Sequence, residues 1–349
     1  MISNEVDPAK RIARCAGTGG RVVLGSLAAL LLLSLSVSCR KKEATPEGTS
    51  APATSAKTSG QAPAEAIDPK PGPPQSVQVT LKIGASSGLR EPHGVAVDGR
   101  GNVYIVDTGN DRIVKFDPSG RELVAFGKKG SDPGQLMKPL VAAVSPQGNL
   151  LVLDSDTSWI QVFTPDGKFV SRFAGPAMNF YHPAGLAVSS DGTVAVADTG
   201  GNRVVLLESG GQLKGSPIAG VEKQPFTQPT DVYFDPRGGI HVYQTANPKA
   251  PSTLFHLTPT GELTGKWIAS EASSTVDTPR FALASDGRVY MTDPHHQQVR
   301  VYDAGGAQYH IVNLGGDLAA PLKLVAGVAI DPQNRVYVVD ARSGLAYRF

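Results

Sequence analysis

Gly94-Val-Ala-Val-Asp98 is the first of six copies of one short element in this chain of 349 residues. The other five are Val141-Ala-Ala-Val-Ser145, Gly185-Leu-Ala-Val-Ser189, Asp231-Val-Tyr-Phe-Asp235, Phe281-Ala-Leu-Ala-Ser285 and Gly327-Val-Ala-Ile-Asp331. Their last residues lie 47, 44, 46, 50 and 46 positions apart. Self-similarity at such a period, carried by short strands, is the mark of a β-propeller with one four-stranded blade per repeat. The sequence therefore predicts an all-β protein.

A second strand follows the first after a tight turn, and in five repeats it ends in aspartate. These strands are Val103-Tyr-Ile-Val-Asp107, Leu150-Leu-Val-Leu-Asp154, Val194-Ala-Val-Ala-Asp198, Val289-Tyr-Met-Thr-Asp293 and Val336-Tyr-Val-Val-Asp340. β-Branched and aromatic residues are typical of strands, and a near-continuous apolar run suits burial on both faces. The span 77–349 divided by the mean period predicts six blades.

The last repeat lacks a fourth strand, because the sequence reaches Phe349 directly after the third. A candidate for the missing strand lies at the other end of the repeat region, where Val77-Gln-Val-Thr-Leu-Lys-Ile-Gly84 alternates apolar and polar residues. We expect this segment to pair with the last three strands and to close the ring. Closure would remove exposed strand edges, which invite aggregation.

Two repeats resemble the NHL repeat family most fully. The matching residues are Pro92-His-Gly-Val-Ala-Val-Asp98, Gly101-Asn-Val-Tyr-Ile-Val-Asp107, Gly109-Asn-Asp-Arg-Ile-Val-Lys-Phe116 and, in the third repeat, Asp198-Thr-Gly-Gly-Asn-Arg203. The resemblance covers residues 77–349 and implies a six-bladed propeller of four-stranded blades. The signature arginine, Arg112 or Arg203, stands five residues after a strand-ending aspartate, and we expect the two to pair inside the blade. Function does not follow, since this fold hosts binding modules and enzymes alike.

Residues 1–38 are interpreted as a signal peptide. Val22–Ser38 is apolar apart from serines and one glycine, and it follows four basic residues, as in a secretory signal. Ser36-Val-Ser-Cys39 resembles a bacterial lipobox, which implies that Cys39 is lipidated and becomes the mature N-terminus. An uncleaved N-terminal membrane anchor is the alternative. Because no aspartate follows Cys39, the resemblance implies an exported protein at the periplasmic face of the outer membrane.

Residues 39–76 are rich in Ala, Pro, Ser, Thr, Gly and Lys and contain almost no large apolar residue. Such a composition cannot bury enough surface to fold, so we expect a disordered tether. The tether would hold the propeller, residues 77–349, away from a lipid surface.

Cysteine and charge counts exclude several classes of function. The two cysteines, Cys15 and Cys39, both precede the propeller, which therefore carries no disulfide, thiolate metal site or haem-attachment motif. The chain has 33 basic and 31 acidic residues; removal of residues 1–38 takes away four bases and two acids, so 29 and 29 remain. A neutral mature chain argues against nucleic acid as a partner, because nucleic-acid binding rests on phosphate neutralisation.

Candidate binding residues lie on the loops that precede the first strand or follow the second, which share one face in NHL-type propellers. Loops on a rigid scaffold commonly carry binding residues. The candidates are His93, Trp159, His182, Arg280, Asn247 and Lys249. The last two belong to an insertion, 244–253, that breaks the repeat pattern. Trp159 replaces the signature arginine, and it is interpreted either as an exposed contact residue or as packing on a neighbouring blade.

Two functions from different classes stay open. The first is an envelope-tethered, non-enzymatic binding or scaffold propeller that engages a protein, peptide or envelope polymer and uses no cofactor; a passive spacer is a variant of it. The alternative is a metal-dependent lyase or hydrolase with its site at the propeller axis.

The metal-dependent alternative depends on few residues. His93 lies in a Pro-His-Gly motif similar to that of the amidating lyases built from this repeat, and Glu91 and His182 are the other metal candidates. The positions equivalent to His93 in the other repeats are occupied by Leu140, Ala184, Thr230, Arg280 and Ala326. A catalytic metal typically needs about three protein ligands. The sequence therefore favours the binding function.

Overall fold

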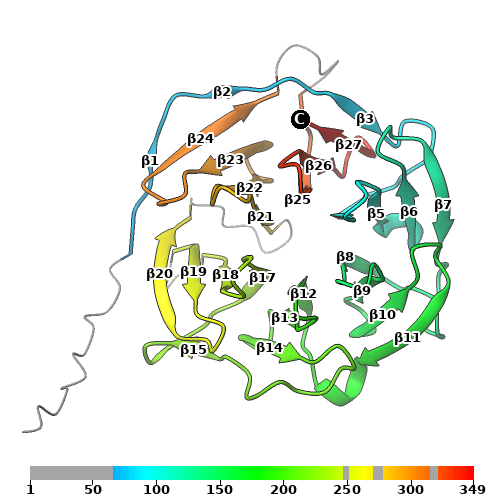
Figure 1. Ribbon diagram of the computed structural model, residues 1–349, viewed down its shortest axis with the longest axis horizontal. Helices are drawn as coiled ribbons and strands as arrows, with labels where there is room; N and C mark the ends of the chain where they lie inside the picture. Colours follow the sequence, from blue (N-terminus) through cyan, green and yellow to red (C-terminus); the bar gives the residue numbers. More distant parts are fainter. Residues whose placement is uncertain (1–65, 247–250, 270–277, 315–320) are drawn as a thin grey trace, which may run out of the picture. The chain divides into compact units, whose positions relative to one another are not determined.

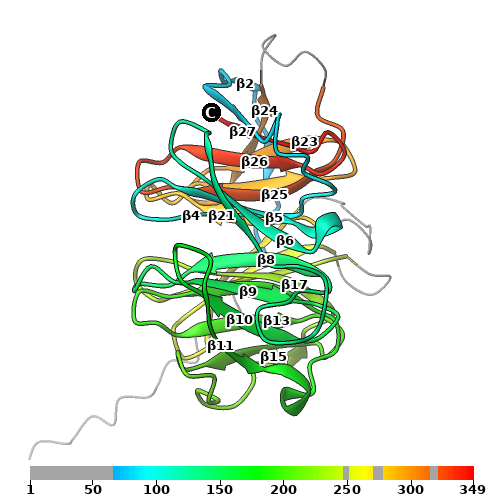
Figure 2. The same cartoon turned by 90° about the vertical axis from the view of Figure 1, so that its right-hand side faces the viewer.

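Six blade sheets are arranged around a central axis, and the strands of each repeat form the antiparallel part of one blade (Figure 1). The computed structural model describes residues 66–246, 251–269, 278–314 and 321–349, all within the unit Ser59–Phe349. Seen edge-on, the strands of each blade run between the two faces of the propeller (Figure 2). The prediction of an all-β, six-bladed propeller is confirmed.

The strands of a blade follow one another from the axis outward. Blades one and two comprise β4 (Gly94–Val97), β5 (Val103–Asp107), β6 (Arg112–Phe116), β7 (Glu122–Phe126), β8 (Pro139–Val144), β9 (Leu150–Asp154), β10 (Trp159–Phe163) and β11 (Phe169–Ala174). Blades three and four comprise β12 (Pro183–Val188), β13 (Val194–Asp198), β14 (Arg203–Leu207), β17 (Pro229–Phe234), β18 (Ile240–Gln244), β19 (Thr253–Leu257) and β20 (Leu263–Ile268). Blades five and six comprise β21 (Phe281–Leu283), β22 (Val289–Asp293), β23 (Gln298–Tyr302), β24 (Gln308–Asn313), β25 (Val325–Ile330), β26 (Val336–Asp340), β27 (Leu345–Arg348) and β3 (Leu81–Ile83). Shorter elements are β1 (Lys70–Pro71), β2 (Gln75–Ser76), β15 (Gly220–Val221), β16 (Gln224–Pro225) and the 3-10 turns Thr108–Asn110 and Gly175–Met178.

The apolar core lies between neighbouring blades. Buried apolar side chains of the described residues form six clusters, each drawn from two adjacent sheets. In β5, Tyr104 packs towards blade two, whereas the next residue, Ile105, packs towards blade six. Successive side chains of a strand point to opposite faces, so a strand between two such interfaces is apolar throughout. This explains the near-continuous apolar run of the second strand.

Glycine occupies the same repeat position of the inner strand in blades one, three and six because the next inner strand comes close there. A Cβ atom at Gly94 would lie 2.7 Å from the carbonyl oxygen of Leu140, and one at Gly185 would lie 2.8 Å from the Cα of Asp231. A side chain does not fit at these distances, and glycine is the residue that permits such a close backbone approach. The repeated glycine is therefore a packing requirement of the axis.

A segment from Ile67 to Ile83, here named the N-terminal strap, follows the outer edges of blades four, five and six (Figure 1). Ile67 bridges to Trp267 in β20, β1 and β2 pair in parallel with β24, and β3 pairs antiparallel with β27. Ile83 is fully buried between blades six and one. Val77 and Val79 pack against the cluster between blades five and six. The strap thus joins three blades.

The strap differs from the expectation of one closing strand over 77–84 after a free tether over 39–76. Backbone pairing with the last blade covers residues 80–83, and residues 67–76, which belong to the expected tether, lie against blades four and five. The amino-acid composition of residues 67–76 did not predict this pairing, because a strand at an outer edge pairs through its backbone groups. An outer edge also tolerates proline, since one side of its backbone needs no partner.

Blade three departs from the four-stranded pattern. Its sheet has three strands, and the outer position is filled by residues 213–218, which join β14 through isolated bridges from Leu213 to Leu207 and from Ile218 to Val204. The hairpin β15–β16 follows directly. The outermost strand has one neighbour, so it depends least on regular pairing.

The predicted signal peptide, Cys39 and the first part of the tether lie outside the described residues, as do Asn247 and Lys249. Within the part of the chain that the structure describes, no helix is long and apolar enough to cross a membrane.

Candidate functional site

The loops that precede the inner strands meet around the axis and enclose a cavity of about 400 Å³ on one face. We call this cavity the channel mouth. Its lining residues are His93, Lys138, Leu140, Ser155, His182, Ala184, Thr199, Thr230, Thr278, Arg280, Pro294 and Ala326. The expectation that these loops share one face therefore agrees with the structure for His93, His182 and Arg280. Asn247 and Lys249 lie outside the described residues.

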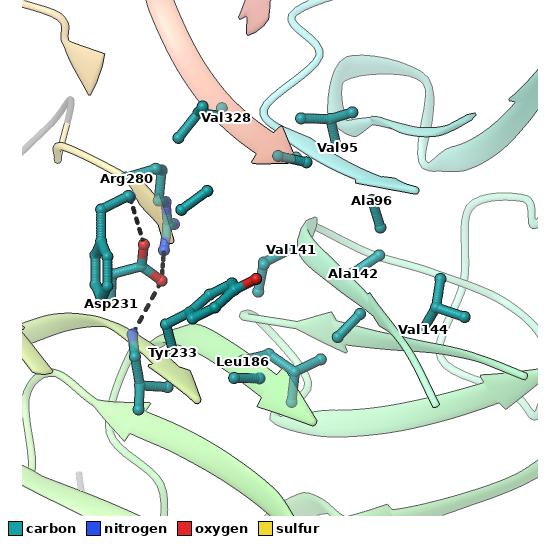
Figure 3. A pocket seen from close by; sticks show the side chains of 18 of the residues that line it. Val95, Ala96, Val141, Ala142, Val144, Leu186, Asp231, Tyr233, Arg280 and Val328 are labelled. Atoms are coloured by element: carbon teal, nitrogen blue, oxygen red, sulfur yellow. Dashed lines mark hydrogen bonds and ion pairs between the residues drawn. The ribbon is translucent and has the colours of Figure 1, made fainter. Parts of the chain in front are cut away.

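Below the mouth, the inner strands enclose a channel of about 220 Å³ (Figure 3). Most of its lining side chains are aliphatic and come from several blades, although polar atoms line it as well: the aliphatic residues include Val95, Ala96, Val141, Ala142, Leu186, Val232 and Val328. Tyr233 projects into this channel, and the paired Asp231 and Arg280 lie at its side (Figure 3). The mouth and the channel share His93, Leu140 and Arg280, so the two cavities adjoin.

Arg280 links three blades at the boundary between mouth and channel. Its Nη1 donates to the carbonyl oxygens of Ala184 (2.7 Å) and Thr230 (3.0 Å) and lies 3.5 Å from Asp231 Oδ1. Asp231 is buried, and its Oδ2 accepts a hydrogen bond from the backbone N–H of Phe281. Burial raises the pKa of the Asp231 carboxyl, and the charge of Arg280 opposes that rise. Arg280 therefore has a structural role in addition to lining the mouth.

Two threonine hydroxyls at the mouth have no partner among the described residues. Thr199 Oγ1 and Thr230 Oγ1 are both buried without a hydrogen bond, and Thr230 is 2% exposed. A buried unsatisfied hydroxyl costs about 1–3 kcal/mol. Buried hydroxyls without a hydrogen-bond partner are uncommon in folded proteins. A ligand that binds beside these two threonines would explain them.

The metal candidates do not assemble into a set of ligands. His93 Nδ1 donates to the backbone carbonyl of Glu91 (2.8 Å), and the Glu91 side chain is absent from the described lining of the mouth. His182 lines the mouth and stacks on Tyr181 with ring centroids 4.5 Å apart. No group of three or more His, Cys, Asp or Glu among the described residues is placed to hold a metal ion. These residues do not fit the axial metal that the alternative function needs.

Trp159 lies away from the mouth. The Arg172 guanidinium sits over its ring at 4.3 Å from the centroid, and a Cβ atom at Gly175 would lie 2.6 Å from the indole. Gly175 follows β11, the neighbouring strand of the same blade. Trp159 therefore packs on strand β11 of its own blade.

The signature arginines form ion pairs with buried aspartates, as expected. Arg112 Nε lies 2.7 Å from Asp107 Oδ2, and Arg203 Nε lies 2.7 Å from Asp198 Oδ2; both aspartate side chains are fully buried. Arg112 also donates to the Ser87 carbonyl in the loop that leads into β4. The signature thus fixes the loop between two blades, which is a structural role.

Sequence reasoning missed Lys138, Ser155, Thr199 and Thr278 as mouth residues. Each is a common surface residue type in a loop, and nothing in the local pattern distinguishes it. Ser155 and Thr199 directly follow the strand-ending aspartates Asp154 and Asp198. Their position could have identified them as mouth residues, because a residue that follows the second strand lies on the mouth face.

Residues 89–116 and 180–205 match the model of the NHL repeat family. These two repeats contain the Arg112–Asp107 and Arg203–Asp198 pairs. The chain carries NHL repeats. This match confirms the resemblance that the sequence motifs indicated.

Among known proteins, Protein brain tumor of Drosophila melanogaster is 34% identical to this NHL propeller over 125 residues, which are 35% of this chain and 12% of that protein. A streptogramin B lyase superposes with a TM-score of 0.56 at 13% identity, covering 77% of this chain and 96% of the lyase. A gluconolactonase from Xanthomonas campestris superposes with a TM-score of 0.53 at 17% identity, covering 82% and 97%. At such low identities the two structures support a shared fold and nothing about activity.

The NHL propeller also contains a histidine pair in blade four, away from the mouth. His241 and His256 lie opposite each other on β18 and β19, with their Nδ1 atoms 2.7 Å apart. His241 Nε2 lies 3.3 Å from Asp235 Oδ2, and His256 Nε2 is buried without a partner among the described residues. Burial lowers the pKa of His241, and burial together with the neighbouring His241 lowers the pKa of His256 to about 3.

We expect the propeller to lose stability as the pH falls from about 6.5 towards 4. In the unfolded chain, His241 and His256 each take up a proton in this pH range. In the folded chain, His256 stays neutral until the pH reaches about 3. The unfolded state therefore binds more protons than the folded state. Each such proton lowers the free energy of unfolding by about 1.4 kcal/mol per pH unit. Urea unfolding across this range checks the slope. The variant His256→Gln should flatten it, whereas the exposed His295→Gln should not; an equal slope in both variants would contradict the assignment.

Proposed function

We propose that this NHL propeller is a non-enzymatic binding protein that engages a protein, peptide or polymer at the channel mouth. The observation that supports the proposal is the composition of that cavity. Two cationic side chains, two histidines and four hydroxyl side chains line about 400 Å³ of space, and two of the buried hydroxyls lack a partner among the described residues. A concave site with a few convergent polar groups is the usual form of a ligand site.

The scaffold suits binding without chemistry. The mouth residues stand at the ends of strands that are packed on both faces, so the loops are held by six blade interfaces. The described lining offers two histidines and no carboxylate, which is short of the roughly three ligands that a catalytic metal uses. A binding function therefore has more support than the axial-metal lyase or hydrolase.

We further propose that the propeller works at the bacterial envelope. Support comes from the sequence: the apolar run Val22–Ser38 after four basic residues, followed by Ser36-Val-Ser-Cys39. Lipid on Cys39 would anchor the chain, with residues 40–65 as tether and the strap as the beginning of the folded part. Palmitate labelling of the full chain that disappears in Cys39→Ala checks this anchor, and an unlabelled wild-type chain would remove it.

The binding face is tested by placing a photo-crosslinking amino acid at Tyr181, whose side chain is 63% exposed beside His182. The matched control carries the same group at Lys168, an exposed residue in the turn between β10 and β11, which lies on the opposite face. We expect the Tyr181 variant to form a discrete adduct in cells and the Lys168 variant to form none of the same mass. Equal adducts at both positions, or none at Tyr181, would contradict binding at the mouth.

A further inference from the structure

We infer that the channel mouth and the channel below it bind an anionic amphiphile, that is, an oxyanion headgroup joined to a short apolar chain. The inference rests on the proposed binding function and specifies the chemistry of the ligand part that enters the mouth. Three independent observations support it: the cations of the mouth, its unsatisfied hydroxyls, and the aliphatic side chains that line the channel.

Two cations line the mouth, and Asp231, which pairs with Arg280, lines the channel below. The described lining of the mouth contains Lys138 and Arg280 and neither aspartate nor glutamate. No described residue accepts a hydrogen bond from Lys138 Nζ, and every described polar contact of the Arg280 guanidinium involves Nη1. Among the described residues, none accepts a hydrogen bond from Nε or Nη2 of Arg280, and arginine matches the geometry of carboxylate and phosphate oxygens.

The unsatisfied hydroxyls lie in the same cavity as these cations. Thr230 Oγ1 and Thr199 Oγ1 are buried and come from neighbouring blades, and both residues line the mouth with Arg280. A hydroxyl donates one hydrogen bond, and an oxyanion offers several acceptor sites. A single oxyanion headgroup at the mouth would therefore satisfy the threonines and supply Lys138 with a counter-charge. A neutral headgroup would accept the hydroxyl hydrogen bonds but leave Lys138 without a counter-charge, and a cationic headgroup would be repelled.

The channel supplies the second half of the ligand site. Val95, Val141 and Val328 lie on its wall, and about 220 Å³ of space begins beside the Arg280 guanidinium (Figure 3). Apolar surface removed from water there stabilises a bound chain in proportion to its buried area. The volume is below the usual range for drug-sized ligands, so the chain that enters is short.

Calorimetric titration of the full chain with defined probes tests the inference. Octanoate and octyl phosphate carry the two oxyanion headgroups, and acetate, butanoate and hexanoate shorten the chain. We expect one site per chain, with the dissociation constant falling about three- to fourfold for each added methylene until the channel is full. Octylamine and octanol should bind at least about tenfold more weakly than octanoate. The stronger of octanoate and octyl phosphate identifies the headgroup as carboxylate or phosphate.

Variants separate ligand contacts from folding. Thr230→Val keeps the side-chain shape and removes an unsatisfied hydroxyl, so unfolding stability should be unchanged or higher while octanoate binding weakens about tenfold. Lys138→Gln should weaken binding severalfold and reduce its salt dependence. Lys168→Gln, on the opposite face, is the matched control and should bind as the wild type does.

Several outcomes would overturn the inference. These are equal affinity for octylamine and octanoate, no dependence on chain length, or unchanged octanoate binding in both Thr230→Val and Lys138→Gln. If neither octyl anion binds while the Tyr181 crosslink still forms, the amphiphile is wrong and the binding face stands. If the crosslink is also absent, the proposed function fails with it.

Discussion

A chain that lacks residues 77–84 is expected to lose its single cooperative unfolding transition. The deletion removes Ile83, which is fully buried between blades six and one, together with Leu81, Val77 and Val79, which pack against the clusters on both sides of blade six. It also exposes the edge of β27, which pairs with β3. Removal of a buried aliphatic side chain typically costs about 2–5 kcal/mol, and a domain is stable by about 5–15 kcal/mol in total.

Thermal unfolding followed by circular dichroism and by calorimetry is the measurement, because agreement between the two probes reports a cooperative transition. A pair of adjacent substitutions provides the control. Ile83→Ala should lower the free energy of unfolding by about 2–5 kcal/mol, whereas the exposed Lys82→Ala should stay within about 0.5 kcal/mol of the wild type. A deleted chain with an unchanged transition would show that blade six does not need the strap.

Asp107→Ala is expected to lower the free energy of unfolding by about 3–5 kcal/mol. The carboxylate is fully buried and accepts hydrogen bonds from the backbone N–H of Arg90 (2.7 Å), from Asn110 Nδ2 (2.8 Å) and from Arg112 Nε (2.7 Å). Its removal leaves the half-buried Arg112 cation and a backbone donor without their acceptor. Breaking one side of a buried pair is costly because the remaining charge is not solvated.

The same loss is expected for Asp198→Ala, since Asp198 pairs with Arg203 in the same way. The two sites lie in different blades and share no partner, so the effects should add in the double variant. Urea unfolding is the measurement. Asp286→Ala is the control, because its pair with Arg288 is exposed on both sides and should be worth about 1 kcal/mol or less. A cost for Asp107→Ala no larger than that of Asp286→Ala would show that the signature pair does not hold the blade.

The repeat unit was predictable from the sequence down to single ion pairs. The buried strand Val103–Asp107 and the pair between Asp107 and Arg112 depend on residues within one repeat, and their alternation and spacing record which side chains are enclosed. The strap was predicted only in part. Its first residues, 67–76, lack the apolar pattern of a strand, because they pair through the backbone at an outer edge.

The candidate site was predicted less well. His93, His182 and Arg280 do meet at the mouth, since each precedes an inner strand and those strands converge on the axis. Trp159 is absent from the described lining of the mouth, and its ring packs on Gly175 and Arg172 of its own blade. Lys138 and Thr199 were not predicted as mouth residues, because lysine and threonine are common in surface loops.

The sequence by itself determined the number of blades, the faces that each strand buries and the ion pairs inside the signature, because all of these recur within one repeat or between neighbours. The tertiary structure alone decided which loop residues gather at the axis, that Thr199 and Thr230 are enclosed there without a partner among the described residues, and that Arg280 reaches Ala184, 96 positions away. Periodicity records contacts that every repeat makes. A cavity at the axis combines one residue from each of several repeats, so no single repeat carries its pattern.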